Sequence, residues 1–507
     1  MRNKFFILAI AIQIFACGGI AFAGAEPSGS SSPAQRSFTL DLAIQTALQQ
    51  NPDILRARQE IRRTKGVFIE VLSQALPHIT ATDQFQRTDP HLDRGGSFSV
   101  SGTGGTSSVS LTDSSYFLRV QTTQLIFSGS VFPAIRGADF QHDSAFFSLR
   151  NVIDQTITTV RQQFYQVILN KALIGVQEES VRLLESQLKD QQNRFEAGTV
   201  PRFNVLQAEV ALANQQPALI TARNNFRISQ LTFAKTLGLD FDPRRGENPG
   251  IECKGELTFQ PRVIALEDAI QIGKERRPFL KQQNANVNNQ RNQLGVAYGG
   301  FFPTINADSA YEWDSSPLTS DISKVSKGWF WGATGTWNIF DGLATAGRVK
   351  QQRALLSQSQ ITYDDAVRQV ELEIQQAYAN LQRDRETIES QEKTTEQAKE
   401  ALRLASARLG AGAGTQLDVL SAQVALTQAA STQLQALYNY TADLAEFDRA
   451  TATQTIYSDL VDVTAKPATS KAAPKPQSKT TTSKKVTTEM KKASTEATPT
   501  PSPGRTR

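Results

Sequence analysis

Two long stretches of the chain carry apolar residues with a period of 3.5. In the first stretch the apolar positions are Ile153, Ile157, Val160, Phe164, Val167, Ile174, Val181, Leu188 and Phe195. In the second they are Val367, Val370, Ile374, Ala377, Leu381, Ile388, Ala398, Leu402, Ala405 and Leu409. This spacing predicts coiled-coil helices, and the polar exceptions on the first seam are Lys171, Glu178, Glu185 and Gln192. Each helix runs for about 65 residues, or roughly 100 Å, a length that no compact domain needs.

Ahead of each long helix, apolar and polar residues alternate with a period of 2. In "INADSAYEWD" from Ile305 and "WFWGATGTWNIF" from Trp329, apolar side chains share one face and polar side chains share the other. The pattern is weaker but similar over residues 79–86 and 116–126. These segments predict four β-strands of about 10–12 residues in two hairpins.

Two interpretations of the hairpins stay open. A soluble sheet with one wet face produces similar alternation. A membrane barrel also explains the aromatic side chains near the strand ends, which would form an interfacial girdle. The candidate girdle residues are Tyr311, Trp313, Trp329, Trp331 and Trp337. Because single-chain membrane barrels begin near eight strands and lipid tolerates no open sheet edge, a four-stranded chain must share its barrel with other chains.

The mature chain contains two copies of one sequence pattern. "LPHITA" from Leu76 parallels "FPTINA" from Phe302, and a second short helix starts near Pro52 in one copy and near Pro278 in the other. Each copy then continues into a hairpin and a long helical hairpin. The predicted segments are 1–23 (signal peptide), 38–76 (helices of the first repeat), 77–128 (first β-hairpin), 130–237 (first long helical hairpin), 238–263 (equatorial connection), 264–302 (helices of the second repeat), 303–341 (second β-hairpin), 343–456 (second long helical hairpin) and 464–507 (tail).

A glycine-containing stretch closes each copy. "RFEAGTVPRFNVLQAEVAL" starts at Arg194, and "RLGAGAGTQLDVLSAQVAL" starts at Arg408. Each predicts a sharp turn between two helices. Such a glycine can be a simple helix C-cap, whereas two turns at matched positions also suit a docking site. The candidate docking residues are Arg194, Phe195, Ala197, Gly198, Thr199, Arg408, Leu409, Ala411, Gly412 and Ala413.

The N-terminus carries an export signal. Arg2 and Lys4, an apolar run too short to span a bilayer, and Ala-Phe-Ala at 21–23 predict a secretory signal peptide. An alternative is that Cys17 becomes a lipidated N-terminus. Cleavage after residue 23 leaves Cys253 as the only cysteine, so an intrachain disulfide is excluded.

The C-terminal segment has a separate composition. From residue 464 onward it is rich in Lys, Thr, Ser, Pro and Ala; its ten basic and two acidic side chains give a net charge of +8, whereas the whole chain is +5. This predicts a disordered tail. The tail is either simply solvated or binds anionic polymer or a phosphate-rich surface, and the export signal argues against nucleic acid.

The sequence carries no enzyme signature. The three histidines have no metal-ligand spacing, and neither a phosphate-binding loop nor a nucleophile elbow occurs. We therefore expect no catalytic residue, no cofactor and no metal.

A duplicated hairpin with a giant helical hairpin resembles the outer membrane efflux protein family, the TolC-like ducts of Gram-negative bacteria. The resemblance covers residues 38–456 and rests on "FEAGTVPRFNVLQAE", "LGAGAGTQLDVLSAQ" and "IFDGLATAGRV", with Leu343 where the family often has glycine. It implies an internally duplicated α+β membrane protein. In it, a homotrimer forms one 12-stranded outer-membrane β-barrel, four strands per chain, continued by a long periplasmic α-helical coiled-coil barrel. It also implies outer-membrane lipid around the barrel, a periplasmic adaptor (membrane fusion) protein at the turns and an inner-membrane pump of unknown class.

The resemblance further implies a constriction at the turns. The family narrows this end with a Tyr–Arg–Asp network and rings of Asp. The Tyr and Arg positions read Leu409 and Gly414 here, and two Asp positions read Asn204 and Ser421. Only Asp418 keeps its carboxylate, so the candidate pore constriction is Asn204, Asp418 and Ser421. Asp418 either lines a cation-favouring ring or serves only as an acidic residue at a helix N-terminus.

These observations favour the outer-membrane channel-tunnel component of a tripartite efflux or type I secretion system, located in the outer membrane and extending into the periplasm. Two other functions stay open. A passive porin-like channel leaves the long helices unexplained. A structural periplasmic coiled-coil protein leaves the tryptophan-rich hairpins unexplained.

Overall fold

The computed structural model describes residues 36–87, 100–102, 105–107, 114–239, 250–262, 265–315 and 325–454. By its internal contacts the chain divides into Met1–Leu460 and Val461–Arg507, and every described residue lies in the first unit. The predicted signal peptide, Cys17 and the predicted tail lie outside the described residues.

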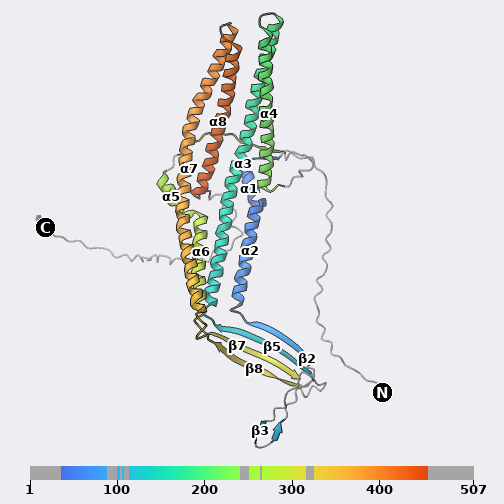
Figure 1. Ribbon diagram of the computed structural model, residues 1–507, viewed down its shortest axis with the longest axis vertical. Helices are drawn as coiled ribbons and strands as arrows, with labels where there is room; N and C mark the ends of the chain where they lie inside the picture. Colours follow the sequence, from blue (N-terminus) through green and yellow to red (C-terminus); the bar gives the residue numbers. More distant parts are fainter. Residues whose placement is uncertain are drawn as a thin grey trace, which may run out of the picture. The chain divides into compact units, whose positions relative to one another are not determined.

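Within the first unit, one order of elements occurs twice (Figure 1). The first series is α1 (Leu40–Gln50), α2 (Pro52–Ser73), β2 (His78–Arg87), β5 (Ser114–Phe127), α3 (Val131–Glu196) and α4 (Arg202–Leu237). The second is α5 (Leu266–Arg276), α6 (Pro278–Gly299), β7 (Thr304–Ser315), β8 (Ser326–Thr336), α7 (Ala344–Gly410) and α8 (Gln416–Ala450). Two further pairs of short strands are β1 (Arg36–Phe38) with β6 (Ile251–Cys253), and β3 (Val100–Gly102) with β4 (Gly105–Ser107).

The second short helix of each series begins at the proline that the sequence analysis identified. Pro52 and Pro278 occupy the first position of α2 and α6, where a missing amide proton loses no hydrogen bond and the fixed φ suits a helix. Asn51 caps α2 with its side-chain oxygen. Its side-chain amide also donates to the carbonyl of Thr236 at 2.8 Å, which attaches the α1–α2 junction to the end of α4.

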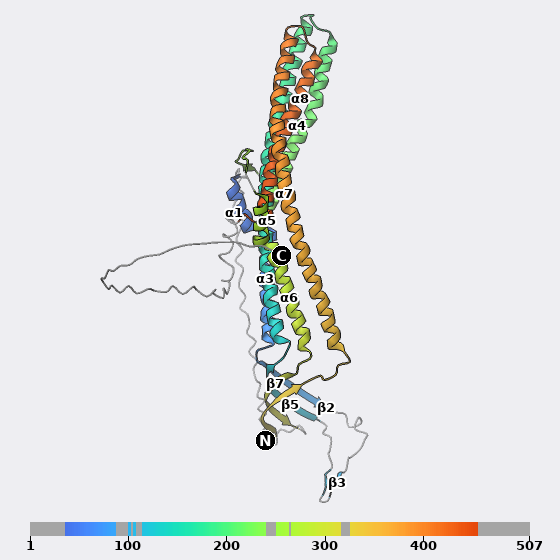
Figure 2. The ribbon, with the colours of Figure 1, turned by 90° about the vertical axis from the view of Figure 1, so that its left-hand side faces the viewer.

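The long helices form two hairpins, α3 with α4 and α7 with α8 (Figures 1 and 2). Helix α3 also packs against α2, α6 and α8. The turns of both hairpins lie at one end of this unit, and the four-stranded sheet lies at the other (Figure 1). Among the described residues, no helix combines the length and the hydropathy that crossing a membrane requires.

The apolar seams follow the predicted pattern in the parts of α3 and α7 nearer the sheet. The buried positions there are Ile153, Ile157, Val160, Phe164, Val167, Val370, Ile374, Ala377, Leu381 and Ile388. The α7 residues pack against α5, α6 and α8, and Phe164 of α3 packs against Phe233 of α4. The period of 3.5 is therefore confirmed in these segments.

The predicted seam of α3 is wrong beyond residue 170. The buried positions there are Ser180, Leu184 and Gln191, and the predicted Phe195 is 44% exposed. The stripe has moved back by one residue, which leaves all four polar exceptions on the exposed side. The physical reason is that unpaired charges are costly to bury, whereas Ser and Gln can find hydrogen-bond partners on α8.

The main sheet is antiparallel with the strand order β2-β5-β7-β8, so β2 and β8 are its edges. Tyr311 lies opposite both Val120 on β5 and Trp329 on β8. Because directly opposed residues share a face, this register gathers the predicted apolar side chains on one side of the sheet. Trp329 and Trp331 are 76% and 83% exposed, so no described residue covers that face.

The opposite face of the sheet is polar. Arg119 forms an ion pair with Glu312 across β5 and β7. Asp308 accepts hydrogen bonds from Gln121 at 3.2 Å and from Thr123 at 2.8 Å. The predicted alternation is therefore confirmed.

One strand ends earlier than predicted. Strand β8 ends at Thr336, so Trp337 lies outside it, and the prediction that alternation continued to residue 340 is wrong. The indole of Trp337 donates to the carbonyl of Phe301 at 3.0 Å. This contact fixes Trp337 at the junction of sheet and helices.

Charged side chains are buried where α6, α7 and α8 meet. Arg277, the residue before α6, is 4% exposed and donates to Glu373 of α7. Arg449 of α8 contacts the same carboxylate oxygen at 3.2 Å. Burial by itself would raise the pKa of Glu373, but the two guanidinium groups outweigh it and hold that pKa below its usual value. Glu373 therefore joins two arginines from different helices.

Two carboxylates face each other between α7 and α8. Asp384 is 3% exposed, and the Arg383 guanidinium lies 2.7 Å from Asp384 and 3.1 Å from Asp443. Burial and a hydrogen bond between the two carboxyl groups raise the pKa of Asp443 to about 6. Tyr438 and Glu446 of α8 also interact electrostatically with Asp443. Burial raises the pKa of Tyr438 as well.

We expect Asp443→Asn to remove a pH dependence of stability between about pH 4 and pH 6. A carboxyl group whose folded pKa exceeds its unfolded value of about 3.9 destabilises the fold when it ionises, so stability falls as the pH rises through this window. The loss amounts to at most about 3 kcal/mol. Thermal unfolding should show the variant above the parent at pH 7 and level with it at pH 4.

A matched control is Asp365→Asn, because Asp365 is an exposed residue of α7 paired with Arg368 at 3.6 Å. It should leave the pH profile unchanged. If the stability of the parent and that of Asp443→Asn changed with pH in the same way, the raised pKa of Asp443 would be contradicted.

Candidate functional site at the helix turns

The turn between α3 and α4 is closed by backbone hydrogen bonds. The amide of Thr199 donates to the carbonyl of Arg194, and the amide of Gly198 donates to that of Phe195, both at 2.9 Å. Gly198 has a φ of +72°, a left-handed conformation that glycine adopts without a Cβ penalty. This arrangement is a Schellman motif, in which the residues after the helix satisfy its last carbonyl groups.

The turn between α7 and α8 repeats this arrangement bond for bond. The amide of Ala413 donates to the carbonyl of Arg408 at 2.9 Å, and that of Gly412 to Leu409 at 3.1 Å. Gly412 has a φ of +76°. The neighbouring glycines differ: α7 still includes Gly410, and a Cβ on Gly414 would lie 3.0 Å from the amide nitrogen of Leu409. Each turn therefore contains one glycine with positive φ.

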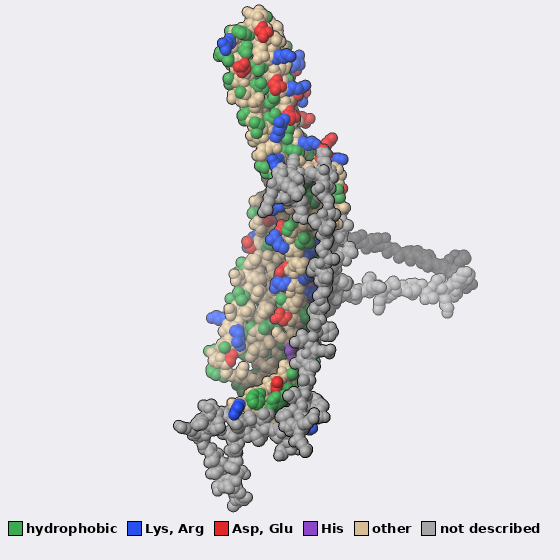
Figure 3. Space-filling view, turned by 90° about the vertical axis from the view of Figure 1, so that its right-hand side faces the viewer, with side chains coloured by type: hydrophobic (Ala, Val, Ile, Leu, Met, Phe, Trp, Pro, Cys, Tyr) green, Lys and Arg blue, Asp and Glu red, His purple; other side chains and the backbone are tan. Residues whose placement is uncertain are grey.

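The candidate docking residues lie together at each turn. The exposed members are Phe195, Ala197, Gly198, Thr199, Arg408, Ala411, Gly412 and Ala413, whereas Arg194 and Leu409 are half-buried. Arg194 forms an ion pair with Asp190 at 2.9 Å. Figure 3 shows acidic and basic side chains mixed over the helices near this end. Small side chains and backbone thus dominate the surface of both turns.

Asp418 belongs to a capping box at the start of α8. Its carboxylate accepts from the amide of Thr415 at 2.9 Å, and the Thr415 hydroxyl accepts from the amide of Asp418 at 3.2 Å. The bond from the Thr415 amide lowers the pKa of Asp418, so the group stays ionised. Helix α4 starts differently, at Pro201 without a side-chain cap.

The three candidate constriction residues occupy related places. Asn204 and Asp418 are each the third residue of their helix. Asp418 and Ser421 are exposed, and Asn204 is half-buried. Within one chain the two helix starts are separate features, so the structure brings these residues to one end of the unit but does not join them in one cluster.

Sequence reasoning missed a polar seam between α3 and α8 just behind the turns. The side-chain amide of Gln191 donates to Gln416 at 3.0 Å, and that of Gln423 donates to the carbonyl of Ser180 at 3.2 Å. Gln191 and Gln416 are 2% and 5% exposed. One amide atom of each has no partner among the described residues. Buried side-chain amide groups therefore contribute hydrogen bonds between the two hairpins here.

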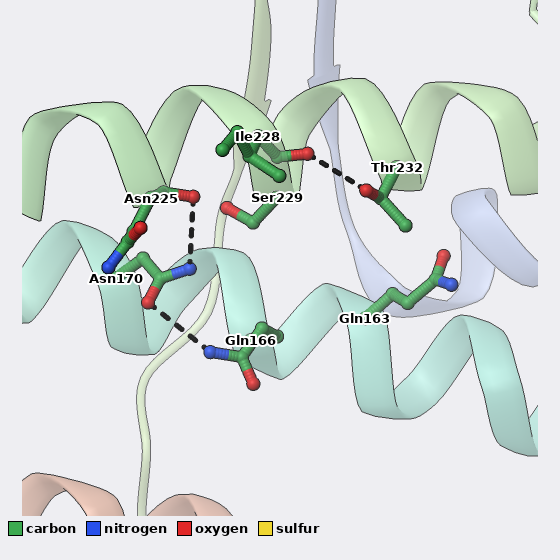
Figure 4. Close-up of a pocket in the computed structure, with 7 residues that line it drawn as sticks. All are labelled: Gln163, Gln166, Asn170, Asn225, Ile228, Ser229 and Thr232. Carbon is green, nitrogen blue, oxygen red and sulfur yellow. Dashed lines mark hydrogen bonds between the residues drawn. The ribbon is translucent and has the colours of Figure 1, made fainter.

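A cleft of about 320 Å³ opens between α3 and α4 (Figure 4). The amide of Asn170 donates to the carbonyl of Asn225 at 3.3 Å, and that of Gln166 donates to Asn170 at 3.2 Å. A neighbouring cleft of about 930 Å³ shares Gln163 and Thr232 with it. Amides and hydroxyls line the smaller cleft, and it presents no acid–base pair. In the described part of the chain, no group of three His, Cys, Asp or Glu side chains is placed to hold a metal ion.

The candidate girdle residues lie at both ends of the sheet. Tyr311 packs against Trp313 and Trp329 with ring centroids 4.3 and 5.0 Å away, near the ends of β7 and β8 that lead to residues 316–324. Trp337 lies at the opposite end, next to the helices. Trp329 and Trp337 are eight positions apart, and all but the last step lies within β8, so the strand places them at most about 26 Å apart. They therefore lie near opposite ends of β8, as two rows of interfacial aromatic residues require.

Comparison with known proteins gives one family. The model of the family described as "Outer membrane efflux protein" matches residues 43–239 and 269–453. These ranges cover both long helical hairpins and both strand pairs. They stop short of residue 464, where the basic composition begins.

Relatives and solved structures agree with this match. Nodulation protein T of Rhizobium leguminosarum bv. trifolii is 22% identical over 401 residues, which cover 76% of this chain and 79% of that protein. The CmeC outer membrane channel of Campylobacter jejuni superposes with a TM-score of 0.72 at 16% identity, covering 83% of this chain and 88% of that one. The outer membrane protein VceC of Vibrio cholerae gives 0.68 at 16% identity, covering 81% and 95%. At these identities the structural likeness concerns the fold.

Proposed function

Because the chain belongs to the outer membrane efflux protein family, and is therefore a component of an outer-membrane efflux channel, we propose that it is the duct of a tripartite efflux or type I secretion system. Its location is the outer membrane, and its helices extend into the periplasm. The observation that carries the proposal is the pair of matched Schellman turns at the end opposite the sheet. A duct that hands substrate from a pump to the outside needs a docking surface there and no catalytic group.

Three chains complete the duct in this proposal. Strands β2 and β8 are sheet edges, and exposed edges are not tolerated in lipid. Pairing β8 of one copy with β2 of the next removes every edge, and three copies give the 12-stranded barrel that the family resemblance implies. The exposed apolar face with Trp329 and Trp331 then contacts outer-membrane lipid, and the polar face with Arg119 and Asp308 lines the pore.

The docking partner at the turns is a periplasmic adaptor protein, itself joined to an inner-membrane pump. Two features support this assignment. The turns present small residues and backbone, which allow close approach of another helical hairpin. They also share one backbone geometry, so one partner motif fits both.

Site-directed crosslinking in cells tests the proposed docking. Cysteines replace Ala197 and Ala411, which are exposed and keep right-handed helical φ values, so the turns stay intact. A third cysteine at Asp365, far from the turns on α7, is the control. We expect the first two to capture one periplasmic protein and the third to capture none. Capture at Asp365 alone would contradict docking at the turns. In a second experiment the gene is deleted; unchanged dye efflux together with reduced sugar uptake would support a passive porin instead.

In the proposed pore, Asp418 forms the remaining charged ring. Leu409 and Gly414 carry no side chain able to form the ion-paired network that the family has at this end. The polar seam between α3 and α8 joins the two hairpins there instead. The capping box does not exclude a pore role, because the exposed carboxylate of Asp418 keeps its charge while accepting one hydrogen bond.

Two substitutions at Asp418 separate its roles. Asp418→Asn keeps an oxygen that can accept from Thr415 and removes the charge, whereas Asp418→Ala removes both. We expect both variants to lower the cation-to-anion permeability ratio in planar bilayers at least twofold. Only the alanine variant should unfold at a lower temperature. Unchanged selectivity in the asparagine variant would leave Asp418 a helix cap alone.

A further inference from the structure

Three consecutive aromatic residues of β8 do not share one face of the sheet. Trp329 lies opposite Tyr311 of β7, whereas Phe330 lies opposite Ala310. Because successive side chains of a strand point to opposite faces, Phe330 lies on the polar face, and Trp329 and Trp331 lie on the apolar one. Alternation in β8 therefore brings an aromatic ring to the side that carries the charged and hydroxyl groups of the sheet.

Small residues surround Phe330 on the polar face. Its neighbours on the same side of β8 are Gly328 and Gly332, and Ala310 across from it is 2% exposed. A Cβ on Gly332 would lie 3.5 Å from Cζ of the ring, so the ring extends along the strand toward this glycine. Because the side chain is 54% exposed, a ring in this position presents one open face.

A carboxylate lies beside this ring. Asp308 of β7 is directly opposite Gly332, the residue toward which the Phe330 ring extends. Directly opposed residues of an antiparallel pair are close neighbours, so the carboxylate borders the ring across the two strands. The hydroxyl of Thr123 donates to Asp308 at 2.8 Å, and that of Thr334 donates to its other oxygen at 3.5 Å. These contacts keep the carboxylate on the polar face.

The polar face as a whole carries a net negative charge. Over the described strands its charged side chains are Arg119, Asp308, Glu312 and Asp314. With His78 neutral, three carboxylates and one guanidinium give a net charge of −2 in each chain. A pore lined by one sign of charge concentrates mobile ions of the other sign. The surroundings of Phe330 therefore attract cations.

We propose that Phe330 and Asp308 form a transit site for planar aromatic cations inside the pore, one in each chain. The site rests on the proposed shared barrel, in which the polar face lines the pore. The ligand stacks on the open face of Phe330, and its positive charge lies beside Asp308, so stacking, cation–π attraction and ion pairing favour the same molecule. A cation without a ring gains less, and an aromatic anion is repelled. Because the other face of the ligand stays in water, it can leave again.

Single-channel recordings of the purified full-length protein in planar bilayers test the site. The probes are aminoacridine, a planar aromatic cation; tetraethylammonium, a cation without a ring; and naphthalene sulfonate, an aromatic anion. The measured quantity is the concentration of each probe that halves the open-channel current. The parent is compared with Phe330→Leu, Phe330→Tyr and Asp308→Asn. Phe85→Leu is the matched control, because Phe85 is a 61% exposed phenylalanine on the apolar face of β2.

We expect aminoacridine to halve the parent current at an about tenfold lower concentration than either other probe. Phe330→Leu should raise the aminoacridine concentration about fivefold and leave tetraethylammonium unchanged, whereas Phe330→Tyr should keep the parent value. Asp308→Asn should weaken block by both cations about threefold. Phe85→Leu should match the parent with every probe. The current without probe shows that each variant still forms the channel.

Three outcomes would overturn the site. They are equal block of the parent by all three probes, unchanged aminoacridine block in Phe330→Leu, and an equal loss in Phe85→Leu. A parent protein that never conducts would instead contradict the shared barrel itself, and the site with it. A conducting parent whose aminoacridine block does not depend on Phe330 would contradict the site alone.

Discussion

Gly238→Ala is expected to destabilise the helical part by about 3–4 kcal/mol. Gly238 ends α4 with a φ of +73°, where any residue with a Cβ is strained by about 1–2 kcal/mol. A Cβ there would also overlap the carbonyl oxygen of Gln50 and lie 2.8 Å from its carbonyl carbon. Backbone cannot rotate away as a side chain can, so the α1–α2 junction would have to separate from α4. Denaturant unfolding followed by far-UV circular dichroism measures the loss.

Gly198→Ala provides the matched control. Its φ of +72° is nearly the same, but nothing lies within 4 Å of the added Cβ. It should therefore lose only the conformational part, about 1–2 kcal/mol. The difference between the two variants isolates the close approach of α4 to Gln50. Equal losses would mean that the junction yields freely and that Asn51, bonded to Thr236, does not fix it.

Features that repeat along the chain could be predicted from the sequence. The alternation of the hairpins, the proline starts of α2 and α6 and the positions of both turns all follow from local patterns, because each depends on residues within a few positions of one another. The turn glycines are an example. A residue with positive φ after a helix favours glycine whatever surrounds it.

Features that depend on a partner far away in the sequence could not be predicted from it. The seam of α3 moves by one residue where Ser180 and Gln191 form hydrogen bonds with α8, and only the four polar exceptions signalled that the period had failed. Trp337 leaves β8 because its indole finds the carbonyl of Phe301, a contact that alternation does not encode. The buried ion-pair cluster joins Glu373 to Arg277, 96 positions away, and to Arg449, 76 positions away. No short window of sequence contains all three residues.

The candidate site shows the same division. Two turns of one geometry were predicted, and the structure has them. Their use as a docking surface depends on a partner, so it stays a proposal. Asp418 was predicted either to line the pore or to stabilise its helix. The capping box establishes the second contribution in one chain, and the first requires the assembled channel.

Glu373→Gln is expected to cost about 3 kcal/mol at pH 7. The carboxylate of Glu373 is the shared partner of Arg277, 4% exposed, and Arg449, 14% exposed. Removing one member of a buried charge group leaves the others without compensation, which costs more than the group contributed when intact. Because the folded pKa of Glu373 lies below the ordinary glutamate value of 4.5, its stabilisation is present above about pH 4.5 and fades as the pH falls through the folded pKa. The deficit of the variant should therefore shrink toward acid pH.

Glu371→Gln, two residues away on the same helix, shows what an exposed pair contributes. Glu371 pairs with Lys274, and their side chains are 34% and 39% exposed, so its loss should cost less than about 1 kcal/mol. Salt should reduce this small effect and leave the Glu373 deficit largely intact, because buried charges are screened less. Similar losses for both variants at low and high salt would contradict the assignment of Glu373 as the residue that joins α6, α7 and α8.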